Sequence, residues 1–166
     1  MSKTKVIVVV GPTASGKTDL GVYIAKKYNG EVISADSMQI YKNMDIATAK
    51  PTISEMDGIK HHLIGFLEPK DEYSVASFCE DAKNVAEEIT AKGKIPVIVG
   101  GTGLYIDSFI NNTTFFEDAN SEKVRAELYN ELNEFGIEKL YDELLSADSE
   151  AAKKIHPNNE VKVIRA

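Results

Sequence analysis

Residues 6–18 read Val-Ile-Val-Val-Val-Gly-Pro-Thr-Ala-Ser-Gly-Lys-Thr, and this segment is the strongest indication of the fold class. The apolar, β-branched run over residues 6–10 is typical of a strand buried on both faces of a parallel sheet. Residues 11–18 match the pattern G-x-x-x-x-G-K-[ST] and lead into apolar side chains at helical spacing, which are Leu20, Tyr23, Ile24 and Tyr28. This strand–loop–helix order predicts an α/β fold, a P-loop NTPase-like parallel sheet covered by helices.

The residue types in the loop suit a bound phosphate. Gly11 and Gly16 permit backbone angles that aim successive N–H groups at an anion, and the following helix adds the positive end of its dipole. Lys17 supplies a cation for phosphate oxygens, and the hydroxyl of Thr18 is placed to bind Mg²⁺. We therefore predict that a di- or triphosphate is bound by Gly11, Pro12, Thr13, Ala14, Ser15, Gly16, Lys17 and Thr18.

Two further strands are predicted, over residues 31–34 and 95–99. Between them, residues 37–70 are polar and contain several Pro and Gly residues, which indicates loops and short elements. Ser74 is suited to cap a helix whose apolar positions are Phe78, Ala82, Val85, Ala86 and Ile89. Because strands and helices alternate, we expect a parallel sheet covered on both faces.

A carboxylate is expected beside the phosphate. A P-loop NTPase typically holds Mg²⁺ with an Asp at the end of a second strand, but the strand at 95–99 is followed by Gly100, Gly101 and Thr102. Asp36 does follow a predicted strand, and the carboxyl ends of strands line the ligand crevice of an open α/β sheet. We expect Asp36 to act as a Mg²⁺ ligand or a general base; the alternative is that it caps the next turn.

The composition is that of an acidic globular protein, with 166 residues, 43% of them hydrophobic, and a net charge of −7. This charge argues against binding of nucleic acid by the whole surface, but it leaves room for a local basic groove. The single cysteine, Cys79, cannot form an internal disulfide, which fits a reducing cytosol. The apolar run at 6–10 is too short to span a membrane, so we expect a cytoplasmic protein with no membrane partner.

Beyond residue 113 the pattern becomes helical and more acidic, with a net charge of −5 against −2 for residues 1–113. We expect a P-loop α/β core over residues 1–113, a small helical insertion over 114–155 and a return to the core over 156–166. The unterminated apolar pattern that begins at Val161 favours a fragment of a longer protein. Two apolar stripes predict the helices of the insertion: Val124, Leu128, Leu132 and Phe135, then Ile137, Leu140, Tyr141, Leu144 and Leu145.

Several segments outside the P-loop carry a family resemblance. They are Asp36-Ser37-Met38-Gln39-Ile40-Tyr41, Asp45-Ile46-Ala47-Thr48-Ala49-Lys50-Pro51, His61-His62, Gly100-Gly101-Thr102-Gly103-Leu104-Tyr105 and Ile155-His156-Pro157-Asn158-Asn159. Together with the P-loop, and from residue 6 to residue 166, they resemble the tRNA dimethylallyltransferases, also called tRNA isopentenyltransferases. The P-loop alone is shared with many kinases, whereas the segments that begin at Asp36 and Gly100 are more specific.

The resemblance implies transfer of a dimethylallyl group from dimethylallyl diphosphate to N6 of the adenosine next to the anticodon in tRNA. It implies Mg²⁺ as a cofactor at Thr18, and catalytic roles for Lys17, Asp36 and Thr102. The P-loop would then stabilise the charge that develops on a diphosphate leaving group. The exocyclic amine of adenine is a poor nucleophile, so a carboxylate that accepts its proton would help, a role that suits Asp36 as general base.

A target base must leave its stack to reach such a site. The resemblance implies that the anticodon stem-loop of tRNA is contacted by Asp36, Ser37, Met38, Gln39, Thr102, Arg125, Lys162 and Arg165. Many relatives have Gln-Arg where this chain has Val161-Lys162; Lys162 keeps the charge but lacks the planar fork of arginine. We expect the protein to act as a monomer.

Other functions fit parts of the same pattern. A P-loop kinase for small molecules would bind ATP at residues 11–18, with Asp36 activating an acceptor hydroxyl. Such a kinase needs a lid that carries several arginines near the transferred phosphoryl group. The arginines of this chain, Arg125 and Arg165, stand far apart in sequence. A close relative would prenylate free adenine nucleotides, and a non-catalytic nucleotide-binding module would not need Asp36. His61 and His62 lack acid or cysteine partners at metal-binding spacing, so no zinc site is expected.

Overall fold

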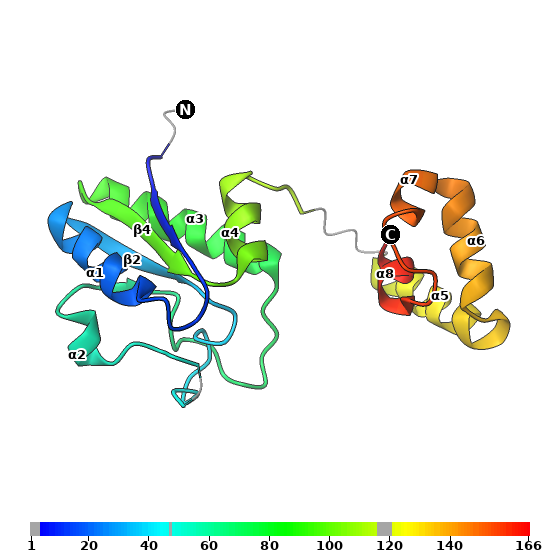
Figure 1. Cartoon of the computed structure of the whole chain (residues 1–166), viewed down its shortest axis with the longest axis horizontal. Helices are drawn as coiled ribbons and strands as arrows, with labels where there is room; N and C mark the ends of the chain where they lie inside the picture. Colours follow the sequence, from blue (N-terminus) through cyan, green and yellow to red (C-terminus); the bar gives the residue numbers. More distant parts are fainter. Residues whose placement is uncertain (1–3, 47, 116–120) are drawn as a thin grey trace. The chain divides into compact units, whose positions relative to one another are not determined.

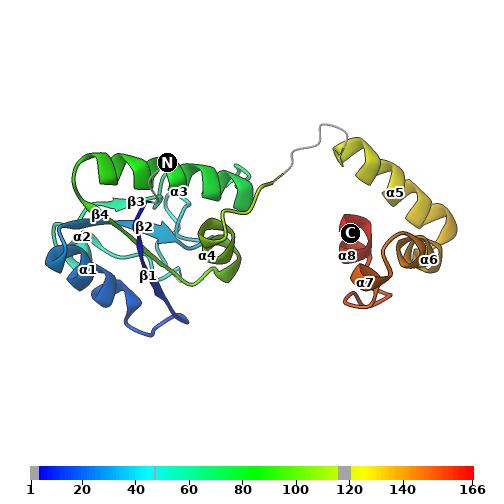
Figure 2. The same cartoon turned by 90° about the horizontal axis from the view of Figure 1, so that it is seen from above.

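The computed structural model describes residues 4–46, 48–115 and 121–166 (Figures 1 and 2). The chain divides into two compact units, Met1–Thr114 and Phe115–Ala166. This division falls one residue after the change at residue 113 that composition and periodicity indicate. Each unit has its own apolar core, as its buried side chains show.

The first unit is built on a parallel sheet with the strand order β1-β4-β2-β3. The strands are β1 (Ile7–Val10), β2 (Gly30–Ala35), β3 (His61–His62) and β4 (Ile95–Gly100). Each pair of neighbours is parallel, and the central pair is in register at Val32 and Val97. The α/β fold class and its parallel sheet are therefore confirmed. The short strand β3 lies inside the stretch that was expected to hold loops and short elements.

Helices cover both faces of this sheet, as Figure 2 shows. On one face, α3 (Val75–Ala91) and α4 (Gly103–Ile110) bury Phe78 and Ile106 against Ile33 and Ile98. On the other face, α1 (Lys17–Lys27) packs Ala25 among valines of the sheet. The expected cap of α3 is present, because the Ser74 hydroxyl accepts a hydrogen bond from the N–H of Ser77. In the described ranges, no helix has both the length and the apolar character needed to cross a membrane.

The buried face of α1 differs from the apolar stripe in its sequence. The residues that face the sheet are Gly21, Val22 and Ala25, whereas Tyr23 is 60% exposed. The reason is the closeness of the helix to β4: a Cβ at position 21 would lie 2.5 Å from Cγ2 of Val99. Small side chains therefore face the sheet; Ile24 still packs partly buried against it, whereas Leu20, Tyr23 and Tyr28 are at least 50% exposed.

Replacement of Gly21 by alanine is expected to lower the free energy of unfolding by about 1–3 kcal/mol, because the added methyl group overpacks the contact with Val99. Alanine is the better helix former by about 1 kcal/mol, so this prediction opposes the local preference. Chemical denaturation measures the difference. Gly103→Ala is the matched control, since a Cβ there meets no atom within 4 Å; equal stability of both variants would contradict the close packing.

A buried ionic cluster lies at the start of β2. The carboxylate of Glu31 contacts Nε2 of His62 and Nζ of Lys94, each at 2.7 Å. Burial by itself raises the pKa of Glu31, but the hydrogen bonds and charges of Lys94 and His62 outweigh it and hold that pKa at about 2. The neighbouring His61 instead places Nδ1 3.0 Å from the carbonyl oxygen of Ile59. The cluster therefore joins β2, β3 and the start of β4.

This cluster predicts a specific acid sensitivity. The ordinary pKa of Glu31 is 4.5 and its folded value is about 2, so its contribution to stability is complete above pH 4.5 and is lost as the pH falls toward 2. The free energy of unfolding falls by about 3 kcal/mol at most as Glu31 becomes protonated. Unfolding measured between pH 5 and pH 2 should show a shallower decline for Glu31→Gln than for the wild type. Glu68→Gln, at an exposed pair with Lys42, should leave the slope unchanged.

The second unit consists of α5 (Ser121–Phe135), α6 (Ile137–Ala147), α7 (Ser149–Ala152) and α8 (Glu160–Arg165). Its core is formed by Leu140 and Leu144 with Val163 and Ile164. Residues 156–166 were expected to return to the first unit, but the structure groups them with the second. The physical reason is that Val163 and Ile164 of α8 close the core between α5 and α6.

Candidate active site

The P-loop joins the end of β1 to the start of α1. Ala14 and Gly16 both have positive φ, 64° and 75°, and this left-handed geometry turns successive N–H groups toward one side of the loop. Lys17 is the first residue of α1, and its Nζ donates a hydrogen bond to the carbonyl oxygen of Pro12 at 2.9 Å. The ammonium group is thus folded back over the loop, where a bound anion would meet it together with the positive end of the helix dipole.

A cleft of about 240 Å³ opens beside the P-loop. Ligand sites for drug-sized molecules usually exceed about 300 Å³, so this cleft suits a small ligand. It brings residues of the P-loop and Asp36 into one site, although they are separated in sequence. The lining residues are Thr13, Ala14, Ser15, Gly16, Lys17, Thr18, Asp19, Asp36, Gln39, Thr48, Ala49, Lys50, Pro51 and Glu55.

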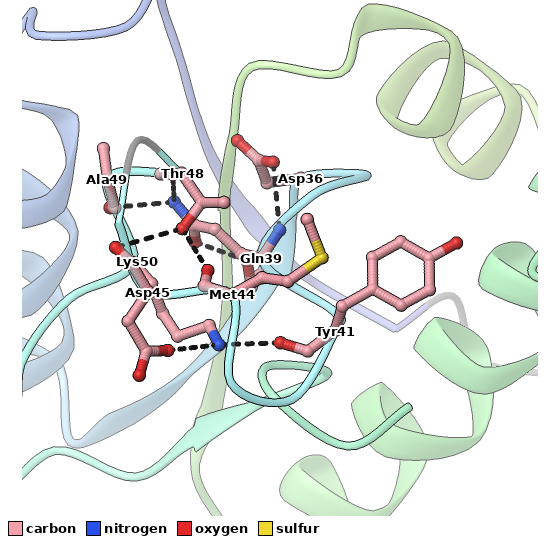
Figure 3. A network of polar contacts seen from close by, with 9 residues as sticks. Asp36, Gln39, Tyr41, Met44, Asp45, Thr48, Ala49 and Lys50 are labelled. Carbon is pink, nitrogen blue, oxygen red and sulfur yellow. Dashed lines mark hydrogen bonds and ion pairs between the residues drawn. The ribbon is translucent and has the colours of Figure 1, made fainter. Parts of the chain in front are cut away.

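Asp36 follows β2, and one of its oxygens is used by the backbone. Oδ1 accepts hydrogen bonds from the N–H groups of Met38 and Gln39 at 2.9 and 3.3 Å, and Figure 3 shows Asp36 beside Gln39. The turn-capping role considered for this residue is therefore present. Within the described residues no hydrogen bond involves Oδ2, so one oxygen orients the carboxylate and the second is left to act on a ligand.

Thr102 follows β4 and is bonded to the residues on either side of Asp36. Its N–H donates to the carbonyl oxygen of Ala35 at 3.2 Å, and its Oγ1 accepts a hydrogen bond from the N–H of Ser37 at 3.0 Å. The strands approach so closely that a Cβ at position 100 would overlap the carbonyl of Ala35, which explains Gly100. Thr102 thus holds the backbone before and after Asp36 and is not among the residues that line the cleft.

Comparison with known proteins decides the family. A family model described as IPP transferase matches residues 39–166, and one described as isopentenyl transferase matches residues 4–67. The chain belongs to the IPP transferase family. This confirms the resemblance carried by the P-loop and by the segments that begin at Asp36 and Gly100.

Relatives in the IPP transferase family are similar along the whole chain. The chain is 51% identical to a tRNA dimethylallyltransferase of Thermoanaerobacter sp. (strain X514), covering 98% of the chain and 51% of the relative. It is 50% identical to the tRNA dimethylallyltransferase of Bacillus subtilis (strain 168), over 99% of the chain and 52% of the relative. The chain therefore spans about half the length of the curated relatives it matches.

Solved structures of the family support the same fold. The full-length tRNA isopentenylpyrophosphate transferase from Bacillus halodurans is 47% identical, with a TM-score of 0.68 over 98% of this chain and 54% of that one. A eukaryotic dimethylallyltransferase, described as acting on tRNA, is 36% identical with a TM-score of 0.85 over 98% and 40%. Both sequence identities are well above the level at which a likeness shows the fold alone.

The residues expected to contact RNA fall into two groups. Ser37, Met38 and Gln39 lie with Asp36 and Thr102 at the carboxyl ends of β2 and β4. Within this first group, Met38 is exposed, and Gln39 uses its side chain in hydrogen bonds inside the protein. The second group lies in the other unit and consists of Arg125 on α5 with Lys162 and Arg165 on α8.

The site residues that the sequence did not single out are Asp19 in the first turn of α1, Glu55, and a group of four at residues 48–51. The cleft is lined here by Thr48, Ala49, Lys50 and Pro51. These residues stand in a segment that carries the family resemblance, but no periodicity or charge pattern assigned a role to any of them. Their position depends on hydrogen bonds that the side chains of Gln39 and Lys50 donate to backbone carbonyls nine or ten residues away. A single sequence does not reveal such bonds.

Proposed function

We propose that the protein to which this chain belongs transfers a dimethylallyl group from dimethylallyl diphosphate to N6 of the adenosine next to the anticodon in tRNA. The observation that carries this proposal is that P-loop residues and Asp36 line the same cleft in a chain of the IPP transferase family. The relatives' names describe tRNA dimethylallyltransferases and support the choice of donor and acceptor.

The P-loop would hold the diphosphate as a leaving group. When the bond between C1 of the prenyl group and the diphosphate oxygen breaks, its electron pair goes to that oxygen, and the N–H groups of the loop and Lys17 stabilise the added charge. The Thr18 hydroxyl would hold Mg²⁺ together with diphosphate oxygens and water. This fits the preference of Mg²⁺ for oxygen ligands, since Thr18 lines the same cleft as the other P-loop residues.

Asp36 would act on the acceptor. As N6 of adenosine forms its bond to C1, it loses a proton, and Oδ2 of Asp36 is suited to accept it while Oδ1 stays bound to the backbone. Thr102 holds Ser37 next to Asp36, so its contribution would be to position this carboxylate and the RNA-facing backbone.

The acceptor adenosine would reach this cleft after leaving its stack. Ser37 and Met38 would meet the base, and Arg125, Lys162 and Arg165 would contact phosphates of the anticodon stem-loop. Because the chain as a whole is acidic, with a net charge of −7, RNA must be bound through local contacts with these cations. We further propose a cytoplasmic, monomeric enzyme.

A small-molecule kinase is the main competing function. Phosphoryl transfer needs several cations around the transferred group, and both arginines of the chain, Arg125 and Arg165, belong to the second unit. Prenylation of free adenine nucleotide would use the same cleft and differ only in acceptor.

One assay separates these functions. With Mg²⁺, dimethylallyl diphosphate and an anticodon stem-loop, the protein should form N6-dimethylallyladenosine, and AMP in place of RNA should give little product. Mass spectrometry of the digested RNA measures the outcome. Preference for AMP would reassign the acceptor, and transfer of phosphate from ATP to a small alcohol would overturn the prenyltransferase proposal.

A further inference from the structure

Two side chains close the loop that forms one wall of the cleft (Figure 3). Nε2 of Gln39 donates to the carbonyl oxygens of Thr48 and Ala49 at 3.2 and 3.0 Å. Nζ of Lys50 donates to the carbonyl oxygen of Tyr41 at 2.7 Å and to Oδ1 of Asp45 at 2.6 Å. We call the Lys50 contacts with Tyr41 and Asp45 the clasp, because they tie the end of the loop to its beginning.

The burial of Lys50 sets the clasp apart from an ordinary surface ion pair. The Lys50 side chain is only 11% exposed, whereas its partner Asp45 is 70% exposed. A lysine is seldom buried to this degree unless its charge is paired. By contrast, Lys42 and Glu68 form a pair of similar length in which both side chains are well exposed, and such pairs contribute little to stability.

The clasp holds a wall made of small side chains. Ala49 and Pro51 line the cleft together with the P-loop residues, and Ala49 has a positive φ of 49°, a conformation that a non-glycine residue adopts only when its surroundings impose it. Gln39 binds the carbonyl of Ala49 from one side, and Lys50 binds the loop start from the other. The wall is therefore placed by hydrogen bonds rather than by its own apolar packing.

The chemistry of the wall suggests what it faces. The P-loop side of the cleft offers N–H groups and Lys17 to an anion, and Asp36 offers a carboxylate oxygen. The Ala49 methyl group and the Pro51 ring offer apolar surface in the same small cleft. A donor that carries a diphosphate at one end and a short hydrocarbon at the other matches this division.

We propose that Lys50 is a positioning residue which, through the clasp, sets the length of prenyl chain that the cleft accepts. The proposal rests on the proposed function, since it assumes a prenyl diphosphate as the donor. Lys50 lines the cleft, but its Nζ is bound to Tyr41 and Asp45, so the proposal assigns it no contact with the diphosphate or the reacting atoms. Lys50 acts by keeping residues 48–51 close to the P-loop, so that five carbons fit and ten do not.

Binding of three probes to the 166-residue chain tests this proposal. Inorganic pyrophosphate, dimethylallyl diphosphate and geranyl diphosphate are titrated with Mg²⁺ by calorimetry. The wild type should bind dimethylallyl diphosphate at least about tenfold more tightly than geranyl diphosphate, because carbons that a pocket cannot accommodate are rejected by factors of this order. In Lys50→Met this ratio should fall toward one, while the affinity for pyrophosphate stays unchanged.

Lys42→Met is the matched control, because it makes the same substitution in the same segment at an exposed pair. It should retain the wild-type ratio. Amide hydrogen exchange provides a second readout: Lys50→Met should lose protection at the N–H groups of Tyr41 and Lys42, which donate to Met38 and Leu67, and keep it in β4. This measurement shows whether the variant is folded and whether the clasp has opened.

Each outcome decides a separate question. The proposal would be overturned if a folded Lys50→Met lost protection in the loop but kept the wild-type ratio of affinities for dimethylallyl and geranyl diphosphate. Unchanged protection of the loop in this variant would overturn it as well. Equal loss of affinity for all three probes would show a general structural role and would also overturn it. Failure of the protein to prenylate RNA counts against the proposed function, whereas donor selectivity is measured by binding alone.

Discussion

Asp36→Asn is expected to lower the rate of prenyl transfer by about 10²–10⁴-fold, the usual contribution of a general base. The asparagine oxygen can still accept the hydrogen bonds that Oδ1 receives from Met38 and Gln39, so the turn after β2 is retained. The substitution thus removes the base without removing the cap. Single-turnover kinetics with saturating dimethylallyl diphosphate and RNA measures the chemical step.

Asp36→Ala removes both functions of this side chain. It should lose activity to the same degree, and in addition it should be less stable by about 1 kcal/mol, because two backbone N–H groups lose their acceptor. Both variants should bind pyrophosphate nearly as well as the wild type. An equal loss of pyrophosphate binding would falsify the role of base and make Asp36 a ligand of the metal. Asp57→Asn, at an exposed position outside the cleft lining, serves as the control.

Lys17→Met is expected to weaken pyrophosphate binding by roughly 10–100-fold, which is the value of a charge-assisted hydrogen bond. The loss in transfer rate should be larger than the loss in binding, about 10²–10³-fold, because the negative charge on the leaving oxygen grows in the transition state. The structure predicts little effect on stability, since the hydrogen bond of Nζ to Pro12 is exposed.

Lys27→Met tests whether this effect belongs to the site. Lys27 stands at the far end of the same helix, where its ammonium lies near the rings of Tyr23 and Tyr28. Lys27→Met should bind pyrophosphate and transfer the prenyl group as the wild type does. If Lys17→Met kept wild-type affinity, the P-loop would hold the diphosphate by its backbone alone, and the assignment of Lys17 would be wrong.

Local patterns were enough to predict the parts of this protein that follow from a few neighbouring residues. The apolar run before Gly11 forms β1, the P-loop leads into α1, and Ser74 caps α3. Asp36 could be placed near the phosphate site because parallel strands present their carboxyl ends at one edge of a sheet. These predictions depend on backbone preferences and on periodicity, which the sequence carries locally.

Contacts between distant segments could not be predicted in the same way. The stripe of α1 that contains Tyr23 looked like its buried face, but the close approach of Gly21 to Val99 turned smaller residues inward. The apolar end of the chain looked like a return to the first unit, but Val163 and Ile164 of α8 complete the core of the second. In both cases the partner surface decided which residues were buried.

The motif that opens the chain is thus sufficient to identify a parallel α/β sheet with a phosphate loop, since glycines, a lysine and a strand suffice to build it. The shape of the rest of the cleft depends on folding. Gln39 and Lys50 reach across several residues to backbone carbonyls, and no spacing rule forecasts such bonds. Gln39 is itself held by the Ser34 hydroxyl of β2, and the loop that it fixes meets the P-loop only in the folded sheet, so this wall of the cleft is a property of the tertiary structure.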